Sequence, residues 1–170
     1  MSIGTNPKDV FETLVSKLRT DLAVADNLCY LAEDHSKTPP NTDEYCYLVE
    51  PGTWQVAQGI FTGAGASGTL VAHQCSIGIH CVNQATDETG RVENFLFRDS
   101  NPFGVYDRLG PVMLSLAGSQ LPNGTGDLLL TAGLLPAGGD WTKFPKSRNG
   151  FAALHFDLMF RWDFGGSCGG

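Results

Sequence analysis

Four potential metal ligands lie close together in one segment of the sequence: His73, Cys75, His80 and Cys81. On an extended strand, His73 and Cys75 would share one side, about 7 Å apart. Cys81 would lie on that side but about 20 Å from Cys75, and His80 would point to the opposite side. A tetrahedral zinc ion needs all of its ligands within about 2.3 Å. An extended strand therefore excludes a shared site, and we expect neither a bound metal ion nor a cofactor.

His155 and Asp157 form a second candidate site, because residues two apart on a strand share a face. With a cysteine such as Cys75 they would resemble the base, the orienting acid and the nucleophile of a small cytoplasmic hydrolase. The alternative is a polar pair on a surface or at an interface. We favour that alternative, since the sequence has no G-x-S-x-G nucleophile motif, and we expect no catalytic residues.

Residues 63–68 match the G-x-G-x-x-G pattern of dinucleotide-binding loops. In such a site the loop opens a helix whose N-terminus binds the pyrophosphate. The following residues, 69–82, are instead rich in β-branched and small side chains, which is typical of a strand. We therefore interpret 63–68 as the tip of a projecting β-hairpin. Trp54 and Phe61 flank a possible strand that precedes this tip and whose other members are small or polar. We interpret the two aromatic residues as candidates for a subunit interface, with core packing as the alternative.

The composition excludes several classes of protein. Of the 170 residues, 42% are hydrophobic, which is too many for a disordered chain, and the 21 glycines lack the period of collagen. The net charge of -7 argues against a protein that grips nucleic acid, and the small basic cluster around 143–148 is interpreted as a solvated loop. We expect no membrane span, no signal peptide and, from five cysteines, free thiols in a reducing compartment.

The elements that would position these residues indicate a single α+β domain over 1–170. An antiparallel or mixed sheet is expected to pack one face against two helices, with the hairpin as a projecting arm. Asn6 and Pro7 predict the start of a helix over 7–24, which carries one apolar stripe. Strands and the Gly-rich hairpin are expected over 45–82, with a strand ending at Pro51 and Gly52.

A second helix is predicted over 102–117, where Gly104, Gly110 and Pro111 predict a kink or a split. The C-terminal strands are expected over 127–164, with one strand at 127–135, a connection at 136–150 and a long last strand from Ala152. Strict alternation of apolar and polar residues marks that last strand. Residues 165–170 are expected to form a flexible tail.

This order of elements resembles the tail terminator and head–tail joining (neck) proteins of long-tailed bacteriophages. The residues that carry the resemblance are an opening helix (DVFETLVSKLRTDL), a strand ending in Pro-Gly (YCYLVEPG), a central strand pair, a helix begun by Asn-Pro, and a long aromatic last strand (GFAALHFDLMFRWDF). The resemblance covers most of 7–164. The chain differs from the family in a longer Gly- and Pro-rich segment at 118–150.

The resemblance implies a structural virion protein, made in the host cytoplasm and located in the tail or neck. Such a protein forms an oligomeric ring, commonly a hexamer, that caps the tail tube, ends its polymerisation and joins tail to head. Its partners would be further copies, the tail tube protein and a head–tail connector protein, while DNA passes through an acidic channel without specific binding. A connector or stopper of the same fold, the hydrolase, and a stand-alone binding module with a Gly-rich recognition loop remain alternatives. Candidate interface residues are Trp54, Phe61, His155, Asp157 and Arg161.

Overall fold

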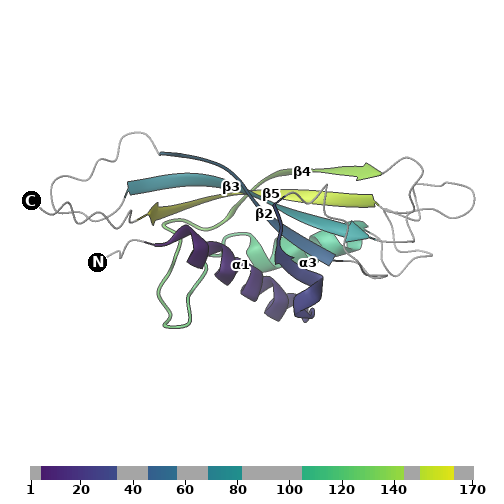
Figure 1. Ribbon diagram of the computed structural model, residues 1–170, viewed down its shortest axis with the longest axis horizontal. Coiled ribbons are helices and arrows are strands. Elements are labelled where there is room, and N and C mark those ends of the chain that lie inside the picture. Colours follow the sequence, from purple (N-terminus) through teal and green to yellow (C-terminus); the bar gives the residue numbers. More distant parts are fainter. Residues whose placement is uncertain (1–4, 34–45, 57–68, 82–104, 144–149, 163–170) are drawn as a thin grey trace, which may run out of the picture.

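The computed structural model describes residues 5–33, 46–56, 69–81, 105–143 and 150–162. Two layers are visible in Figure 1: a long twisted sheet above and two helices, α1 and α3, below it. The fold is therefore α+β, with a mixed sheet packed by two helices, as the sequence predicted. The predicted hairpin tip at 63–68, Phe61 and the predicted tail at 165–170 lie outside the described residues.

Helix α1 spans Pro7–Leu22 and begins at the predicted cap. The Asn6 side-chain oxygen accepts a hydrogen bond from the Lys8 backbone N–H at 3.0 Å, which satisfies one of the unpaired amides of the first turn. The helix ends at Ala23, which adopts the left-handed conformation with φ 51°. A short 3₁₀ turn, Asp26–Leu28, then leads into the first strand.

The sheet has the order β1-β2-β3-β5-β4. The strands are β1 (Cys29–Leu31), β2 (Cys46–Val56), β3 (Thr69–Cys81), β4 (Leu135–Lys143) and β5 (Gly150–Trp162). β1 runs parallel to β2, and every other neighbouring pair is antiparallel. β3 and β5 pair along their whole lengths and form the centre of the sheet. Helix α3 (Val105–Leu116) continues through Pro111 without the predicted split.

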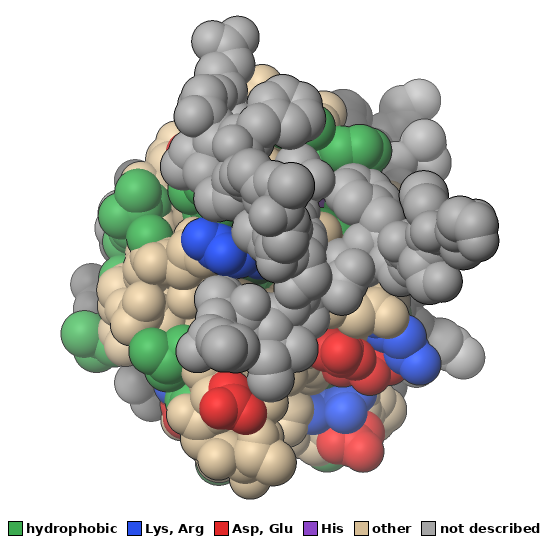
Figure 2. Space-filling view, turned by 90° about the vertical axis from the view of Figure 1, so that its left-hand side faces the viewer, with side chains coloured by type: hydrophobic (Ala, Val, Ile, Leu, Met, Phe, Trp, Pro, Cys, Tyr) green, Lys and Arg blue, Asp and Glu red, His purple; other side chains and the backbone are tan. Residues whose placement is uncertain are grey.

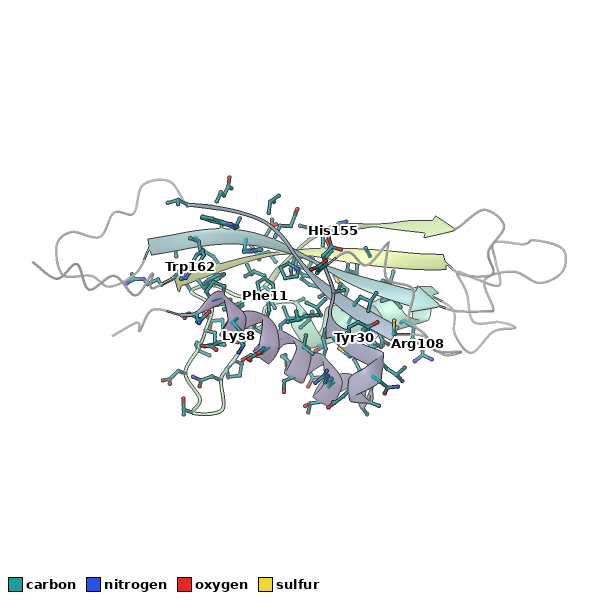
Figure 3. All side chains as sticks on the ribbon, viewed as in Figure 1. Lys8, Phe11, Tyr30, Arg108, His155 and Trp162 are labelled. Carbon is teal, nitrogen blue, oxygen red and sulfur yellow. The ribbon has the colours of Figure 1, made fainter. Side chains whose placement is uncertain are left out.

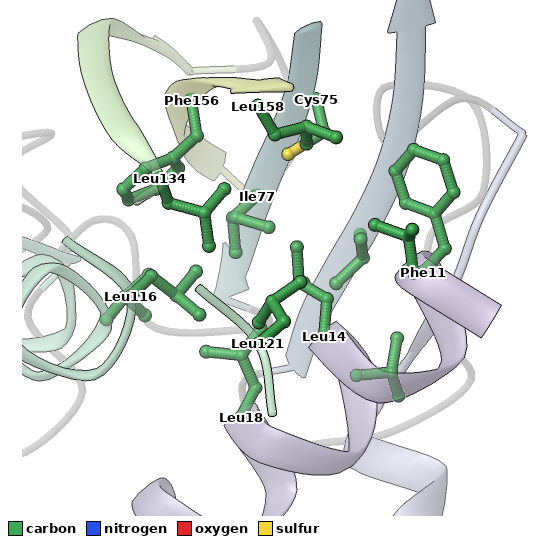
Figure 4. Close-up of a cluster of buried hydrophobic side chains, with 14 of the residues drawn as sticks. Phe11, Leu14, Leu18, Cys75, Ile77, Leu116, Leu121, Leu134, Phe156 and Leu158 are labelled. Carbon is green, nitrogen blue, oxygen red and sulfur yellow. The ribbon is translucent and has the colours of Figure 1, made fainter. Parts of the chain in front are cut away.

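One apolar core lies between the helices and the sheet (Figure 4). Alternate residues of β3 and β5 face it, since Cys75, Ile77, Phe156 and Phe160 are all fully buried. The apolar stripe of α1 packs against them, together with residues of α3 and of the segment that follows it. The contributing residues are Val10, Phe11, Leu14, Val15, Leu18, Val112, Leu116, Leu121, Leu130 and Leu134.

The prediction that a strand ends at Pro51 and Gly52 is wrong, because β2 continues through both residues to Val56. Its register against β3 shifts between Pro51 and Trp54, which marks a bulge. A proline is tolerated at a bulge, where a ladder hydrogen bond is already missing. A Cβ on Gly52 would lie 2.7 Å from the Gln74 backbone oxygen, so this close approach of two strands requires glycine.

The two assignments before the last strand are also wrong. The predicted strand at 127–135 is irregular chain whose Leu130 and Leu134 enter the core, and the predicted connection at 136–150 contains β4. Gly138 has φ +117°, and a Cβ on Gly139 would lie 2.5 Å from the Ala153 backbone oxygen. The glycines that argued against a strand therefore permit a bulge and a close strand contact.

Candidate functional site

The candidate site is the side of β3, β5 and β4 that faces away from the helices, which we call the open face. It carries the side chains that alternate with the core residues: Leu70, Ala72, Gln74, Ser76, Leu135, His155, Asp157, Met159 and Arg161. All of them are half-buried or exposed. In Figure 3 the label of His155 stands above the sheet, while Phe11 and Lys8 lie below it on α1. Small, polar and charged side chains predominate on the open face, in contrast to the core face.

Cross-strand register arranges the open face in rows. Ser76 lies opposite His155, and the Ser76 Oγ is 2.8 Å from the His155 Nδ1. One row further along, Gln74 lies opposite Asp157 and its amide donates to the Asp157 Oδ1 at 3.4 Å. Leu135 of β4 flanks Asp157 on its other side. The sequence-predicted pair of His155 and Asp157 therefore lies on one face, as expected, but each contacts a β3 side chain opposite it.

A cavity of about 430 Å³ opens along these rows. One wall is the bulged end of β2, with Thr53 and Gln55, and the other is formed by Ala132, Gly133 and Leu135. Its floor contains Ala72, Gln74, Asp157 and Met159. The volume lies in the range of small-ligand sites, which are usually apolar with a few polar groups. Here the carboxylate of Asp157 and the amides of Gln55 and Gln74 lie among apolar side chains, which suits a long side chain with a charged or polar end.

Trp54 lies at the end of β2, near the start of α1. Its side chain is 51% exposed, and its ring nevertheless packs edge to face against Trp162 of β5. Val56, two residues further along β2, is 47% exposed. Figure 2 looks onto this end of the molecule, and hydrophobic side chains reach the surface along one flank. One side of the Trp54 ring thus packs against Trp162, while about half of the side chain remains exposed.

The hydrolase alternative needs a thiol close to His155, and Cys75 does not provide one. Cys75 lies in the core, opposite Phe156, whereas His155 points to the open face. Burial raises the pKa of the Cys75 thiol to about 12 and that of the Cys29 thiol to about 11. Because the thiolate is the nucleophile, both thiols are inert at neutral pH. Within the described residues, Cys29, Cys46 and Cys75 are all buried.

The predicted lack of a shared metal site concerns residues that the structure describes only in part. His73 and Cys75 both point toward the helices, where the His73 ring contacts Phe11 edge to face and stacks on Phe160. Burial lowers the pKa of His73. The hydrogen-bonding contact of its ring with the Gln74 backbone oxygen acts in the opposite direction and raises the pKa, but burial is the larger effect. Among the described residues, no group of three or more His, Cys, Asp or Glu side chains could hold a metal ion.

The comparisons with known proteins add no relative: no protein-family model matches the chain, and no curated protein matches its sequence. Within the described part of the chain, no helix has both the length and the apolar character needed to cross a membrane.

Of the open-face residues, the sequence pointed to His155, Asp157 and Arg161; Gln74, Ser76, Leu135 and Met159 are among those that it did not single out. Leu135 could not be found, because the segment that follows it was interpreted as a connection. Gln74 and Met159 carry a usable signal, since each directly adjoins a buried residue of the opposite face and the alternation of β3 and β5 places both.

Proposed function

We propose that this protein is a structural virion protein of the tail-terminator or head–tail joining type, and that it acts by assembling rather than by catalysing a reaction. It forms a ring of identical copies, commonly six, at the end of the tail tube of a long-tailed bacteriophage. The ring ends tube polymerisation and offers a surface to the head–tail connector. Its place is therefore the tail or neck of the virion.

One observation carries the proposal: β2 ends in exposed apolar side chains. The ends of β2, β3 and β5 lie together at one end of the sheet, near the start of α1 (Figure 1). Trp54 and Val56 are about half exposed there. Neighbouring exposed apolar groups are typical of surfaces that another protein covers. A closed ring needs such a patch to meet a different patch on the next copy, because ring contacts are heterologous.

The open face and the charge support the same proposal. The described part of the open face offers no thiol close to His155, so the hydrolase alternative gains nothing from it. The net charge of -7 per chain gives a ring a strongly negative total. DNA would pass such a ring without adhering to it, provided that acidic side chains line the channel.

The test is assembly with tail tube protein from the same phage. The purified protein is added to polymerising tube protein, and tube lengths and end structures are recorded by electron microscopy. We expect capped tubes that stop growing, with a ring at one end. Tubes that elongate unchanged, without a ring, would contradict the proposal.

A pair of matched variants locates the contact. Trp54→Asp introduces a charge at the proposed ring contact, whereas Leu114→Asp introduces the same charge at an 88% exposed position of α3. We expect Trp54→Asp to abolish capping and Leu114→Asp to retain it, with both variants folded by circular dichroism. Equal capping by both would remove Trp54 from the ring contact.

A further inference from the structure

Among the described residues, the open face carries two charged side chains that take part in no ion pair. Asp157 and Arg161 lie on the same side of β5, four residues apart, with Met159 midway between them. Within the described residues, the ion pairs are Lys8–Glu12, Lys17–Asp21 and Arg19–Asp26, and neither Asp157 nor Arg161 takes part in one. The contact of Asp157 with Gln74 is a long hydrogen bond to an amide. A negative and a positive group thus remain available on one surface.

The two charges cannot neutralise each other within one chain. Four residues of a strand span about 13 Å, well beyond the reach of a direct ion pair. The two sites also differ in shape. Asp157 lies on the floor of the cavity, between Gln74 and Leu135, whereas Arg161 lies beyond it, near the end of β5.

We propose that the open face is a self-complementary docking surface for a second copy of this chain, related to the first by a two-fold axis near Met159. Such an axis sets the two β5 strands antiparallel, face to face. Arg161 of each copy then lies over Asp157 of the other, and two equivalent ion pairs form. A two-fold contact uses the same patch on both copies, and the order Asp157, Met159, Arg161 meets that requirement.

The dimensions fit this arrangement. Packed sheets lie about 10 Å apart, which an arginine side chain bridges to a carboxylate on the facing sheet. The cavity of about 430 Å³ supplies the room for the incoming guanidinium beside Asp157. Met159 and Leu135 supply apolar contact around it, and Leu135 is 61% exposed in the single chain. Planar guanidinium groups suit such a carboxylate because two parallel hydrogen bonds can form.

This inference concerns the free protein and does not depend on the role at the tail end. The ring contact proposed above lies at the strand ends around Trp54, and the two-fold contact lies on the open face around Met159. A protein that dimerises but leaves tail tubes uncapped would support the two-fold contact and contradict the ring contact. A protein that caps tubes but remains monomeric when free would support the ring contact and contradict the two-fold contact.

The experiment is a charge exchange followed by sedimentation and light scattering of the full-length chain. Asp157→Arg alone and Arg161→Asp alone each create like charges across the axis. We expect each to raise the dimer dissociation constant by about tenfold or more. Mixing the two variants restores opposite charges at both contacts, so a mixed dimer forms where neither variant alone associates. The double variant D157R/R161D is expected to dimerise like the unchanged protein.

Two controls carry the same changes of charge on α1. Glu12→Arg and Lys8→Asp alter an exposed ion pair on the helix side of the molecule, and we expect dimerisation to persist in both. Added salt is expected to weaken the wild-type dimer, since the ion pairs at the rim are screened. Met159→Asp, which sets two carboxylates against each other near the axis, is expected to leave a monomer.

Three results overturn the proposal. The first is a monomer at every concentration tested. The second is failure of the mixed charge variants to associate although both are folded by circular dichroism. The third is a particle larger than a dimer that Arg161→Asp dissociates and Trp54→Asp does not, which would mean that Asp157 and Arg161 meet in a head-to-tail contact without a two-fold axis.

Discussion

Trp54 and Trp162 meet edge to face, with ring centroids 5.5 Å apart and an angle of 75° between the ring planes. They come from β2 and β5, which are separated in the sheet by β3. The contact therefore spans the strand between them and joins the ends of three strands near the start of α1. The contact fixes the position of the Trp54 indole, which the proposed contact between copies needs.

A double-mutant cycle on Trp54 and Trp162 measures this contact. Aromatic pairs of this geometry contribute about 0.5–1.5 kcal/mol beyond the area that they bury. We expect Trp54→Ala and Trp162→Ala to destabilise the protein less when combined than the sum of their separate effects, by about that amount. Urea unfolding followed by circular dichroism gives the three free energies. Strictly additive losses would show that the two rings are energetically independent.

A single substitution of Phe156 tests the packing of the core. Phe156 lies on β5 and is fully buried in the core between the sheet and the helices. Phe156→Ala is expected to cost about 3–5 kcal/mol, because the lost ring leaves a cavity that the packed layers cannot close. Leu114→Ala, at an exposed position of α3, serves as the control and is expected to change stability by less than about 0.5 kcal/mol. A loss below 1 kcal/mol for Phe156→Ala would contradict the two-layer packing.

The sequence predicted the elements whose pattern is set by one neighbouring layer. α1 carries a single apolar stripe with Asn6 at its cap, and β5 alternates strictly, so both were found near their observed bounds. The same alternation placed His155, Asp157 and Arg161 on one face without knowledge of the sheet order. A local sequence pattern is enough to predict an element when each of its residues faces either one neighbouring layer or solvent.

The remaining elements depend on contacts that are distant in sequence. Pro51 and Gly52 normally end a strand, but here β3 supplies the partner and a bulge absorbs the proline. β4 contains the pair Gly138 and Gly139, which the approach of β5 requires, so its strand pairing overrides low strand propensity. The cavity on the open face is lined by the end of β2 and the start of β4. Both segments were assigned incorrectly from the sequence, which therefore could not predict the cavity.

The lowered pKa of His73 predicts a loss of stability in mild acid. Burial lowers its pKa below the ordinary 6.5, since its ring lies between Phe11 and Phe160. The unfolded chain then binds a proton more readily than the folded one, so the contribution is full above pH 6.5 and is lost as the pH falls below it. His73→Phe is expected to flatten the stability curve between pH 7 and pH 5. His155, on the opposite face, provides the control through His155→Phe, and equal curves for wild type and His73→Phe would contradict the prediction.

The raised pKa of the Cys75 thiol predicts a loss of stability in alkali. Burial raises the pKa of its thiol from 9.0 to about 12, so the unfolded chain releases this proton first. The contribution is full below pH 9.0 and is lost as the pH rises toward 12, with a slope on the order of 1 kcal/mol per pH unit. Urea unfolding between pH 8 and pH 10.5 measures it. Cys75→Ala is expected to remove this part of the slope, whereas Ile77→Val, which alters the same core without a thiol, is expected to retain it. A Cys75 thiol that is alkylated in the folded protein at pH 8 as fast as in urea would show that the core does not shield it.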